Sequence, residues 1–552
     1  MNKAIDTNLK ANENKHYCTI ETAAFDIYFI IMLVLKGLGF TSGNVYQAAV
    51  VLASLCLAFK ALIGKYNSVQ KAVLLSITMF AVVCWRSSND MGTLFCISLV
   101  AAMKGIEKKH AFRLGAVVWT ISFVVLTLSQ LLNIGTRDFV IHSKFGLGYI
   151  IRWALGYSHP NVLQIAYTVL VFYWMYLVHP DDSRSLLYDK KTLLSLILSA
   201  LGAVYIFLYS FSTTGFLMYF IYLFTLLYLE NRRRAGAKRG KTEKLLMVSI
   251  FPACVLLSIL GPVLLKGTAF DAINRLMNTR PALSRIYLTE YGVSLLGRDF
   301  SFLPASITLD CSYMYLLMHG GLILFLLFTV GYFLLIKWTV SQKSSWENSN
   351  EIAMLISFSF TAMSEPFAFN TSYKNVTLIF LGYYLYHISE HCGVGKAWVS
   401  GLQQIGERKV YILDMWELLI QFKEKLCHIA RRYKVAVIGT GTIAAVIGMS
   451  IFLSNSRPLK QAVARRISCE TDDAMESVYY TEKEINALRE DPSTIVLNYK
   501  DEEDPMLLFD NSKMFLLEKI RGGVSSAIWI GTGAAIILCM AITFVERPKT
   551  KT

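Results

Sequence analysis

The sequence predicts an all-α fold, that of a polytopic integral membrane protein with about 14 transmembrane helices. Of its 552 residues, 54% are hydrophobic and 17% are charged, whereas soluble domains carry about a quarter charged residues. Apolar runs long enough to cross a hydrocarbon layer about 30 Å thick follow one another along most of the chain. Lysine and arginine collect in alternate loops between these runs. These observations exclude an ordinary soluble fold.

A polar tail, residues 1–23, precedes the first apolar run and contains no short apolar core followed by a small-residue cleavage site. We therefore expect the first run to remain as a membrane anchor. The predicted helices begin near Ala24, Tyr46, Lys71, Met91, Leu114, Val162, Thr192, Gly215, Leu245, Ser312, Ile352, Val376, Val435 and Ser525. The shortest of these runs are those near Lys71, Met91 and Val376.

Orientation follows from the short basic loops KYNSVQK, EKKHAFR and NRRRAGAKRGKTEK, which fall on one side if every run crosses once. Because positive loops stay in the cytoplasm, this side is predicted to be cytoplasmic, together with both termini. These loops also account for the net charge of +15, so no nucleic-acid partner is expected. Two long loops are then extracytoplasmic, residues 135–161 and the stretch that begins at Lys266.

Three parts are predicted beyond the tail: a polytopic membrane domain at 24–388, a cytoplasmic connector at 389–434 and a C-terminal module at 435–552. The connector is amphipathic, with apolar residues on one helix face: Ile412, Trp416, Leu419, Phe422 and Leu426. It either lies on the inner leaflet or packs on the cytoplasmic ends of other helices. The module consists of a helix, a small extracytoplasmic segment at 455–523 and a final helix.

The stretch from Lys266 to Leu317 lies between two apolar runs but is rich in charge. Its charged residues include Arg275, Arg280, Arg285, Arg298 and Asp310. Such charge beside a bilayer indicates either an ionic substrate or a solvated loop whose basic residues touch lipid headgroups. Two other ionisable residues lie at membrane depth and are functional candidates. Glu365 ends the eleventh run, and Lys36 lies in the first run, where its side chain either serves function or snorkels to an interface.

The segment RWALGYSHPN, residues 152–161, leads from the first long external loop into the sixth helix. Pro160 suits the first turn of a helix, where its missing N–H would be unpaired in any case. His159 then faces the aqueous side at the start of that helix, where it is either incidental or functional.

Several motifs follow one another along the chain: RWALGYSHPN, the turn SFSTTG, NRLMNTR, YGVSLLG and LDCSYMYLLMHGG. In their order and spacing, from about residue 20 to about residue 390, the chain resembles the Wzy-type O-antigen and capsular polysaccharide polymerase family, within the O-antigen ligase and polymerase superfamily. The resemblance implies an inverting glycosyl transfer on the outer face of the bacterial cytoplasmic membrane. A growing glycan on undecaprenyl pyrophosphate would pass to the next lipid-linked repeat unit.

The resemblance also implies roles for individual residues. Asp310 would be the catalytic base, at the position where the related ligases have a histidine, and His159 would be the reserve base. The residues expected to bind pyrophosphate are Arg280, Arg152 and Arg275. Asn161, Tyr313 and Glu365 are the further candidates for substrate binding. Glu365 is chosen for its charge at membrane depth, and Tyr313 is chosen because an aromatic ring either stacks on a sugar or belongs to an interface belt or the core. The turn SFSTTG departs from the family pattern because it lacks the arginine that commonly follows Ser or Thr there.

Physical chemistry is consistent with these roles. Pyrophosphate leaving a sugar carbon gains negative charge, and guanidinium groups bind phosphate oxygens through paired hydrogen bonds. The acceptor hydroxyl needs a base, and the pKa of Asp310 would be either raised by desolvation or lowered by a nearby arginine. No cofactor and no metal are expected, since the pair Asp181-Asp182 falls on the cytoplasmic side and no CxxC motif occurs.

Two other functions stay open. An O-antigen-type ligase would hand the glycan to a different acceptor, although Asp310 in place of histidine argues mildly against it. A lipid-linked oligosaccharide flippase or other transporter would favour charges near the bilayer midplane and recognisable repeat halves. The expected partners are the undecaprenyl-pyrophosphate-linked oligosaccharide, the lipid bilayer, and flippase and chain-length regulator proteins. The C-terminal module superficially resembles such regulators.

Overall fold

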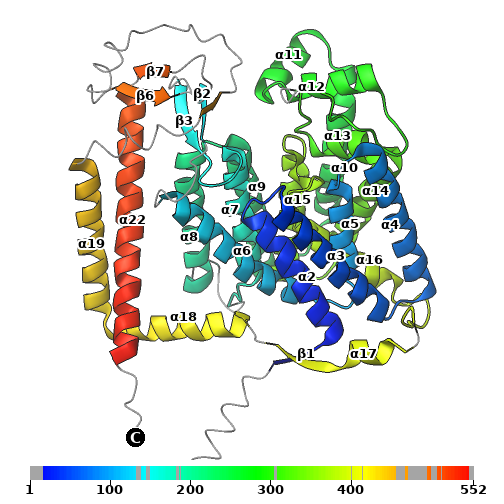
Figure 1. Ribbon diagram of the computed structural model, residues 1–552, viewed down its shortest axis with the longest axis horizontal. Helices are drawn as coiled ribbons and strands as arrows, with labels where there is room; N and C mark the ends of the chain where they lie inside the picture. The colour runs from blue at the N-terminus through cyan, green and yellow to red at the C-terminus, as the bar shows by residue number, and fades with distance from the viewer. Residues whose placement is uncertain are drawn as a thin grey trace, which may run out of the picture. The chain divides into compact units, whose positions relative to one another are not determined.

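The computed structural model describes residues 16–131, 139–143, 149–181, 186, 188–303, 307–399, 401–412, 415–454, 467–469, 494–498, 506–510 and 512–545. The chain divides into two compact units (Figure 1). The first unit consists of Met1–Phe123, Gln164–Val204 and Thr213–Leu413, and the second of Val124–Leu163, Tyr205–Ser212 and Asp414–Thr552. The predicted domain limits at 388 and 434 are not tested by this division and stay predictions.

The main helices are α2 (Ile20–Gly37), α3 (Asn44–Ile63), α4 (Ser68–Ser88), α5 (Gly92–Ala102), α6 (Lys108–Leu131), α7 (Pro160–Tyr176), α8 (Lys190–Ser210), α9 (Thr213–Arg234), α10 (Lys241–Leu264), α14 (Gly321–Ser341), α15 (Trp346–Thr361), α16 (Thr377–Ser389), α18 (Met415–Arg432), α19 (Lys434–Ser454) and α22 (Ser512–Val545). Shorter elements between α10 and α16 are α11 (Gly267–Leu276), α12 (Arg280–Ile286), the π-helix η1 (Tyr287–Tyr291), α13 (Ser312–Tyr315), the π-helix η2 (Leu316–Gly320) and the 3₁₀ helix η3 (Pro366–Ala368). A further short helix, α17, covers Gln403–Glu407.

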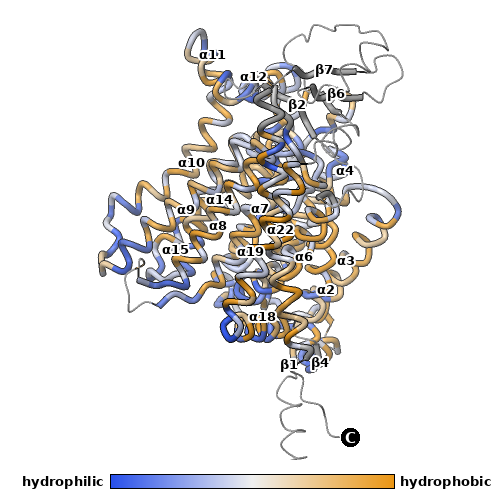
Figure 2. The backbone as a smooth tube through the Cα atoms, turned by 90° about the vertical axis from the view of Figure 1, so that its left-hand side faces the viewer, coloured by the Kyte–Doolittle hydropathy of each residue, from blue (hydrophilic) through white to orange (hydrophobic). Residues whose placement is uncertain are grey.

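Within the described ranges, nine helical spans are long and apolar enough to cross a membrane. They are α3, α4, α6, α8, α9, α10, the continuous run α13–η2–α14, α19 and α22. This agrees with the prediction of an all-α polytopic membrane protein. Helices also occupy the other five predicted positions, as α2, α5, α7, α15 and α16, but they are shorter or more charged, so the count of fourteen crossings stays a prediction. Figure 2 shows apolar residues along the long helices and polar ones near their ends.

Helix α15 forms the centre of the first unit, where it packs along α9 and is buried at nearly every position. Several of its buried polar side chains are paired inside the protein, as is usual for buried polar groups. Tyr222 of α9 donates to Asn350 Oδ1 at 2.5 Å, and Tyr176 of α7 donates to Glu351 Oε1 at 2.9 Å. These bonds fix α15 and, with it, the loop that follows its C-terminal end.

Contacts within the first unit join segments that the sequence assigns to the same side of the membrane. On the predicted cytoplasmic side, Lys60 Nζ lies 3.3 Å from Glu21 Oε1 and donates to the carbonyl oxygen of Lys104 at 2.6 Å. On the opposite side, Ser87 Oγ donates to the carbonyl oxygen of Gly297 at 2.8 Å. This grouping is expected if successive helices cross the membrane in alternate directions. Which of the two sides faces the cytoplasm stays a prediction.

In the second unit, α19 and α22 form an antiparallel hairpin that small residues bring into close contact (Figure 1). A Cβ atom at Gly531 would lie 2.8 Å from both Ala445 Cβ and the carbonyl oxygen of Gly441, so only glycine fits there. This is the small-residue packing typical of membrane helix pairs. Helix α18 contacts both helices and lies across their ends in Figure 1, which suits an amphipathic helix in the membrane plane.

Short strands occur that the sequence did not predict. Strand β1 (His16–Thr19) pairs antiparallel with β4 (Lys409–Ile412), which joins the N-terminal tail to the connector. Strands β2 (Phe139–Ser143) and β3 (Tyr149–Trp153) form a sheet with β5 (Ile467–Cys469), and β6 (Thr494–Asn498) pairs with β7 (Met506–Asp510). Most of the predicted tail (1–23) and most of the predicted external segment (455–523) lie outside the described residues.

Candidate functional site

The motif NRLMNTR forms the turn between α11 and α12. Asn278 and Thr279 both adopt left-handed backbone conformations, with φ of 52° and 63°, which are uncommon for residues other than glycine. The side chain of Asn274 stabilises this turn by accepting a hydrogen bond from the backbone N–H of Ala282 at 3.0 Å. The reversal makes Arg280 the first residue of α12 and fixes the direction from which its side chain leaves the backbone.

Arg280 lies between two carboxylates in the first unit. Its Nε is 3.3 Å from Asp310 Oδ2, and its Nη2 donates to Glu365 Oε1 at 3.3 Å. The contact with Asp310 is an ion pair by distance, but its direction is not that of a hydrogen bond. The side chains of Arg280 and Glu365 are 12% and 8% exposed, whereas that of Asp310 is 36% exposed. Asp310 is therefore the carboxylate of this cluster that solvent or a substrate can reach.

The backbone around the two carboxylates is tied together by Ser312, which follows Asp310 in the motif LDCSY. Its hydroxyl donates to the carbonyl oxygen of Glu365 and accepts from the N–H of Ala368 at 3.2 Å. Its own N–H donates to the carbonyl oxygen of Ala362 at 2.8 Å. Burial raises the pKa of the neighbouring Cys311 thiol, which therefore stays neutral beside the cluster. Hydrogen bonds thus hold Asp310 and Glu365 in a fixed relation, although they are far apart in the sequence.

The motifs YGVSLLG and LMHGG lie against each other. The N–H of Arg298 donates to the carbonyl oxygen of Met318 at 3.1 Å. A Cβ at Gly297, where φ is +83°, would lie 2.0 Å from the carbonyl oxygen of His319, so this contact requires glycine. Gly321 also has a left-handed φ of +81°, and its Cβ would meet the backbone of Gly297. These glycines allow two chain segments to approach at backbone distance.

A second polar group nearby was missed by the sequence interpretation. Tyr315 donates to Asp90 Oδ2 at 2.6 Å, and the ring of His319 stacks on that of Tyr315 with centroids 4.5 Å apart. Among the described residues, Nδ1 of His319 is buried and has no hydrogen-bond partner. Tyr315 and His319 are four residues apart, and this spacing places both on one face of a helix. The spacing was the sequence pattern that could have predicted their contact. Asp90 could not be linked to them without the fold.

The other arginines of the stretch have different environments. Arg285 donates from Nε to the carbonyl oxygen of Pro262 at 2.5 Å and from Nη2 to that of Leu265 at 2.6 Å. Its guanidinium also lies 3.5 Å from the ring centroid of Phe270, so it closes the C-terminal end of α10. Arg275 is exposed and, within the described part of the chain, makes no ion pair. Arg275 is therefore available to an external anion.

Tyr313 lies in the core. It is 2% exposed, its hydroxyl donates to the carbonyl oxygen of Ser359 at 2.9 Å, and its ring meets that of Phe251 edge-on at 5.9 Å. A sugar could stack on this ring only after the core had opened. The predicted substrate-binding role of Tyr313 is not tested and stays a prediction.

Arg152, His159 and Asn161 belong to the second unit, where they lie close to one another. Arg152 is 4% exposed and donates from Nε to the carbonyl oxygen of Ser210 at 2.9 Å and from Nη2 to Asn161 Oδ1 at 2.6 Å. His159 Nδ1 accepts from the N–H of Asn161 at 3.1 Å, which caps the start of α7. These contacts are structural, and the predicted roles of all three residues in catalysis or binding stay predictions.

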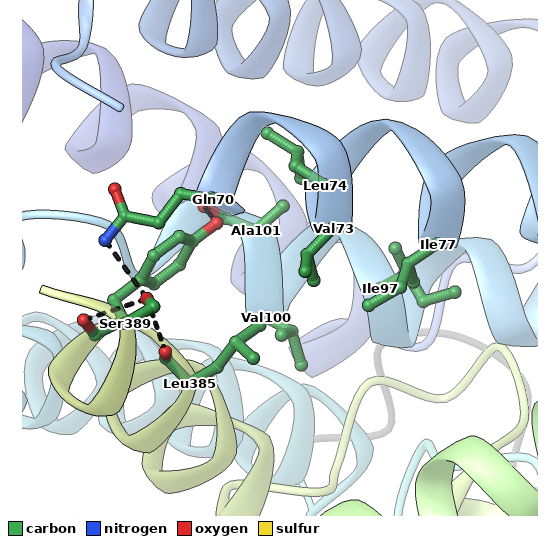
Figure 3. A pocket seen from close by; sticks show the side chains of 10 residues that line it. Gln70, Val73, Leu74, Ile77, Ile97, Val100, Ala101, Leu385 and Ser389 are labelled. Carbon is green, nitrogen blue, oxygen red and sulfur yellow. Dashed lines mark hydrogen bonds between the residues drawn. The ribbon is translucent and has the colours of Figure 1, made fainter. Parts of the chain in front are cut away.

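A pocket between α4, α5 and α16 is mainly apolar (Figure 3). Its polar groups bond to one another, since Gln70 Nε2 donates to Ser389 Oγ at 3.1 Å and Ser389 donates to the carbonyl oxygen of Leu385 at 2.8 Å. The pocket is lined by the half of α4 that is distant from Asp90. It is therefore separate from the polar cluster around Arg280.

No group of three or more His, Cys, Asp or Glu side chains suited to a metal ion occurs in the part of the chain that the structure describes. Independence of metal stays a prediction. Comparison with protein families, with curated proteins and with solved structures found no match.

Proposed function

We propose that the protein is a polysaccharide polymerase that joins undecaprenyl-pyrophosphate-linked repeat units on the outer face of the cytoplasmic membrane. The observation that carries the proposal is the cluster of Arg280, Asp310 and Glu365. Arg280 and Asp310 come from the predicted external stretch that begins at Lys266 and lie in two of the motifs that carry the family resemblance, while Glu365 comes from the end of the eleventh run. A partly exposed carboxylate beside a nearly buried guanidinium is suited to proton transfer at a membrane surface.

In the proposed reaction, Asp310 accepts the proton of the acceptor hydroxyl. The acceptor oxygen forms a bond to the anomeric carbon of the donor glycan, and the bond from that carbon to the pyrophosphate oxygen breaks. Pyrophosphate leaves with the electron pair, and attack from the opposite face inverts the configuration. Arg280 positions the Asp310 carboxylate, because two carboxylates already engage its guanidinium. The exposed Arg275 is then better placed than Arg280 to contact the leaving pyrophosphate.

The decisive test compares Asp310→Asn with Glu365→Gln in purified, folded protein supplied with defined undecaprenyl pyrophosphate repeat units. Asp310→Asn keeps the shape but cannot accept the proton, so we expect polymerisation to slow by about 100-fold or more while the donor still binds. Glu365→Gln removes the second carboxylate and should have a smaller effect, because Glu365 is buried beside Arg280. His159→Gln, in the other unit, serves as a control for the reserve base.

Two results would contradict the proposal. Wild-type polymerisation by a folded Asp310→Asn protein would remove this residue from the mechanism, and collapse in His159→Gln alone would move the role of the base there. The products separate the other candidate functions. Transfer of intact polymer to a foreign acceptor would indicate a ligase, and translocation of repeat units without bond formation would indicate a transporter.

A further inference from the structure

Two buried lysines of the first unit lie outside the cluster around Arg280 and beside the same part of α5. Lys36 Nζ lies 5.2 Å from the ring centroid of Phe95, and the next residue, Cys96, contacts the carbonyl oxygen of Ala368, which Asn375, the neighbour of Lys374, also contacts. Lys374 lies in the connection between η3 and α16 and is 5% exposed, and Lys36 lies in the last turn of α2 and is 4% exposed. Within the described part of the chain, neither ammonium makes an ion pair with a carboxylate, and Lys374 also has no hydrogen-bond partner. Buried lysines are rare unless they are paired, so this arrangement requires an explanation.

The fold holds Lys374 in place through both of its neighbours. Tyr373 adopts a left-handed φ of 58°, and its hydroxyl shares a hydrogen bond of 2.9 Å with that of Tyr28 in α2. On the other side, Asn375 Nδ2 donates to the hydroxyl of Tyr332 at 2.9 Å and to the carbonyl oxygen of Ala368 at 3.0 Å. Strained backbone persists only where the surroundings fix it, and such positions concentrate at functional sites. The burial of Lys374 is thus imposed by the loop around it.

The partners of Lys36 among the described residues are neutral. Its Nζ donates to the hydroxyl of Tyr46 at 2.8 Å and lies 4.4 Å from the centroid of that ring and 5.2 Å from that of Phe95. Aromatic faces offset part of the cost of burying an ammonium, but they do not supply a negative charge. Lys36 is a second cation, and it repels the charged form of Lys374. This repulsion adds to the cost of burying the Lys374 ammonium. Two such cations are most stable together when an anion lies between them or one is deprotonated.

We propose that Lys36 and Lys374 form a binding site for the phosphate group of a membrane lipid. Lysine is a compact cation with three N–H donors and binds phosphate as a point charge. The hydroxyl of Tyr46 can add a further donor. The turn between α2 and α3 borders Lys36 and exposes apolar side chains, with Phe40 43% and Val45 74% exposed. An anionic headgroup with an apolar tail matches this combination better than a free ion does.

The lysine site does not depend on the proposed function. If the proposed function holds, the site would bind the pyrophosphate of one of the two lipid-linked substrates. Lys36 and Lys374 are not members of the cluster of carboxylates around Arg280. Binding can be measured without repeat units and without turnover, so its failure would leave the polymerisation assay untouched. Conversely, an inactive Asp310→Asn protein should keep the lysine site.

The experiment uses the full-length protein in phosphatidylcholine nanodiscs and compares wild type with Lys374→Met and Lys36→Met. Lys266→Met is the matched control, because Lys266 is an exposed lysine at the start of α11. Calorimetry measures binding of inorganic pyrophosphate, and native mass spectrometry measures retention of phosphatidic acid that is included in the nanodiscs. We expect each of the Lys374→Met and Lys36→Met variants to lose about 10-fold or more in affinity, the usual effect of removing a charged hydrogen-bond donor, and Lys266→Met to bind as wild type does.

The two probes distinguish the source of the phosphate. Retention of phosphatidic acid together with weak binding of pyrophosphate supports a lipid ligand, whereas tight binding of pyrophosphate alone would overturn that assignment. Equal binding of both probes by wild type and Lys374→Met would overturn the site itself. Replacing a buried, unpaired charge by an apolar side chain is expected to preserve folding, and Lys374→Arg, which keeps the charge, should retain more affinity than Lys374→Met.

Discussion

The burial of Lys374 predicts a specific pH dependence of stability. Burial, together with repulsion from Lys36, lowers the pKa of Lys374 from its usual 10.5 to about 7. Between these two values the unfolded chain carries this proton and the folded protein does not, so the stability of the folded protein rises with pH. Below about pH 7 both states carry the proton, and the folded protein bears the whole cost of the buried charge. Lys374→Met removes the titrating group and with it this slope.

The magnitude follows from the number of protons involved. One proton contributes about 1.4 kcal/mol of unfolding free energy per pH unit. From about pH 7.5 to about pH 9, the wild-type protein should therefore gain about 2 kcal/mol relative to Lys374→Met. Lys36 is the other charged group at this place, and the hydroxyls of Tyr28 and Tyr373 ordinarily titrate above this range.

The assay is unfolding by heat or denaturant in neutral detergent and phosphate-free buffer, at several pH values. The quantity that matters is the difference in pH slope between wild type and Lys374→Met, because the ionisable groups other than Lys36, which loses a neighbouring charge, have the same environment in both. Lys266→Met, at an exposed position, should keep the wild-type slope. Parallel slopes for wild type and Lys374→Met would refute the reasoning. Saturating pyrophosphate should also flatten the wild-type slope, since a bound anion favours the charged lysine.

Two further predictions concern topology and packing. After the exposed native cysteines have been replaced, a single cysteine at Ser87 should react with an impermeant thiol reagent in intact cells. A single cysteine at Ala235 should react only after the cells are lysed. The reverse pattern would invert the predicted orientation. Gly531→Val should force α19 and α22 apart at Ala445 and lower the unfolding free energy by about 1–3 kcal/mol. Gly533→Val, where no neighbouring atom lies within 4 Å of the new Cβ, should have little effect, and equal effects would argue against the close helix contact.

The helices could be predicted from the sequence because a membrane helix is recognised by its own run of apolar residues and by the charged loops beside it. Both are properties of the local sequence. The structure places a helix at each predicted position, including α5 and α16, which are short. Helix α15 shows the limit of this approach, since its first half contains Asn348, Asn350 and Glu351. Tertiary partners make these polar groups acceptable in the core: the carbonyl oxygen of Thr339 for Asn348, Tyr222 for Asn350, and Lys108 with Tyr176 for Glu351. The pairing of β1 with β4 likewise joins segments about 390 residues apart and leaves no local signal.

The candidate site could be predicted in part. The charge of Arg280, Asp310 and Glu365 was visible in the sequence, and each was named as a candidate. Their pairing was not visible, because it depends on how α12, the end of α15 and the start of α13 come together. Lys374 carried no signal that separated it from an exposed loop lysine, since its burial depends on the left-handed backbone at Tyr373. Sequence patterns identify chemical groups, while the fold decides which of them are neutralised.

That distinction bears on two tasks of the proposed reaction, deprotonation of the acceptor and binding of the phosphate. Around Arg280, two carboxylates surround one guanidinium and Asp310 is the partly exposed one, so the cluster offers an acceptor oxygen to a hydroxyl donor. At Lys36 and Lys374 the described residues supply no carboxylate partner, so these lysines suit a phosphate better than a hydroxyl donor. A protein that must both deprotonate an acceptor and bind a phosphate would benefit from this separation, since a base adjacent to bound phosphate would be repelled by it. Loss of turnover in Asp310→Asn and loss of phosphate binding in Lys374→Met should therefore occur independently.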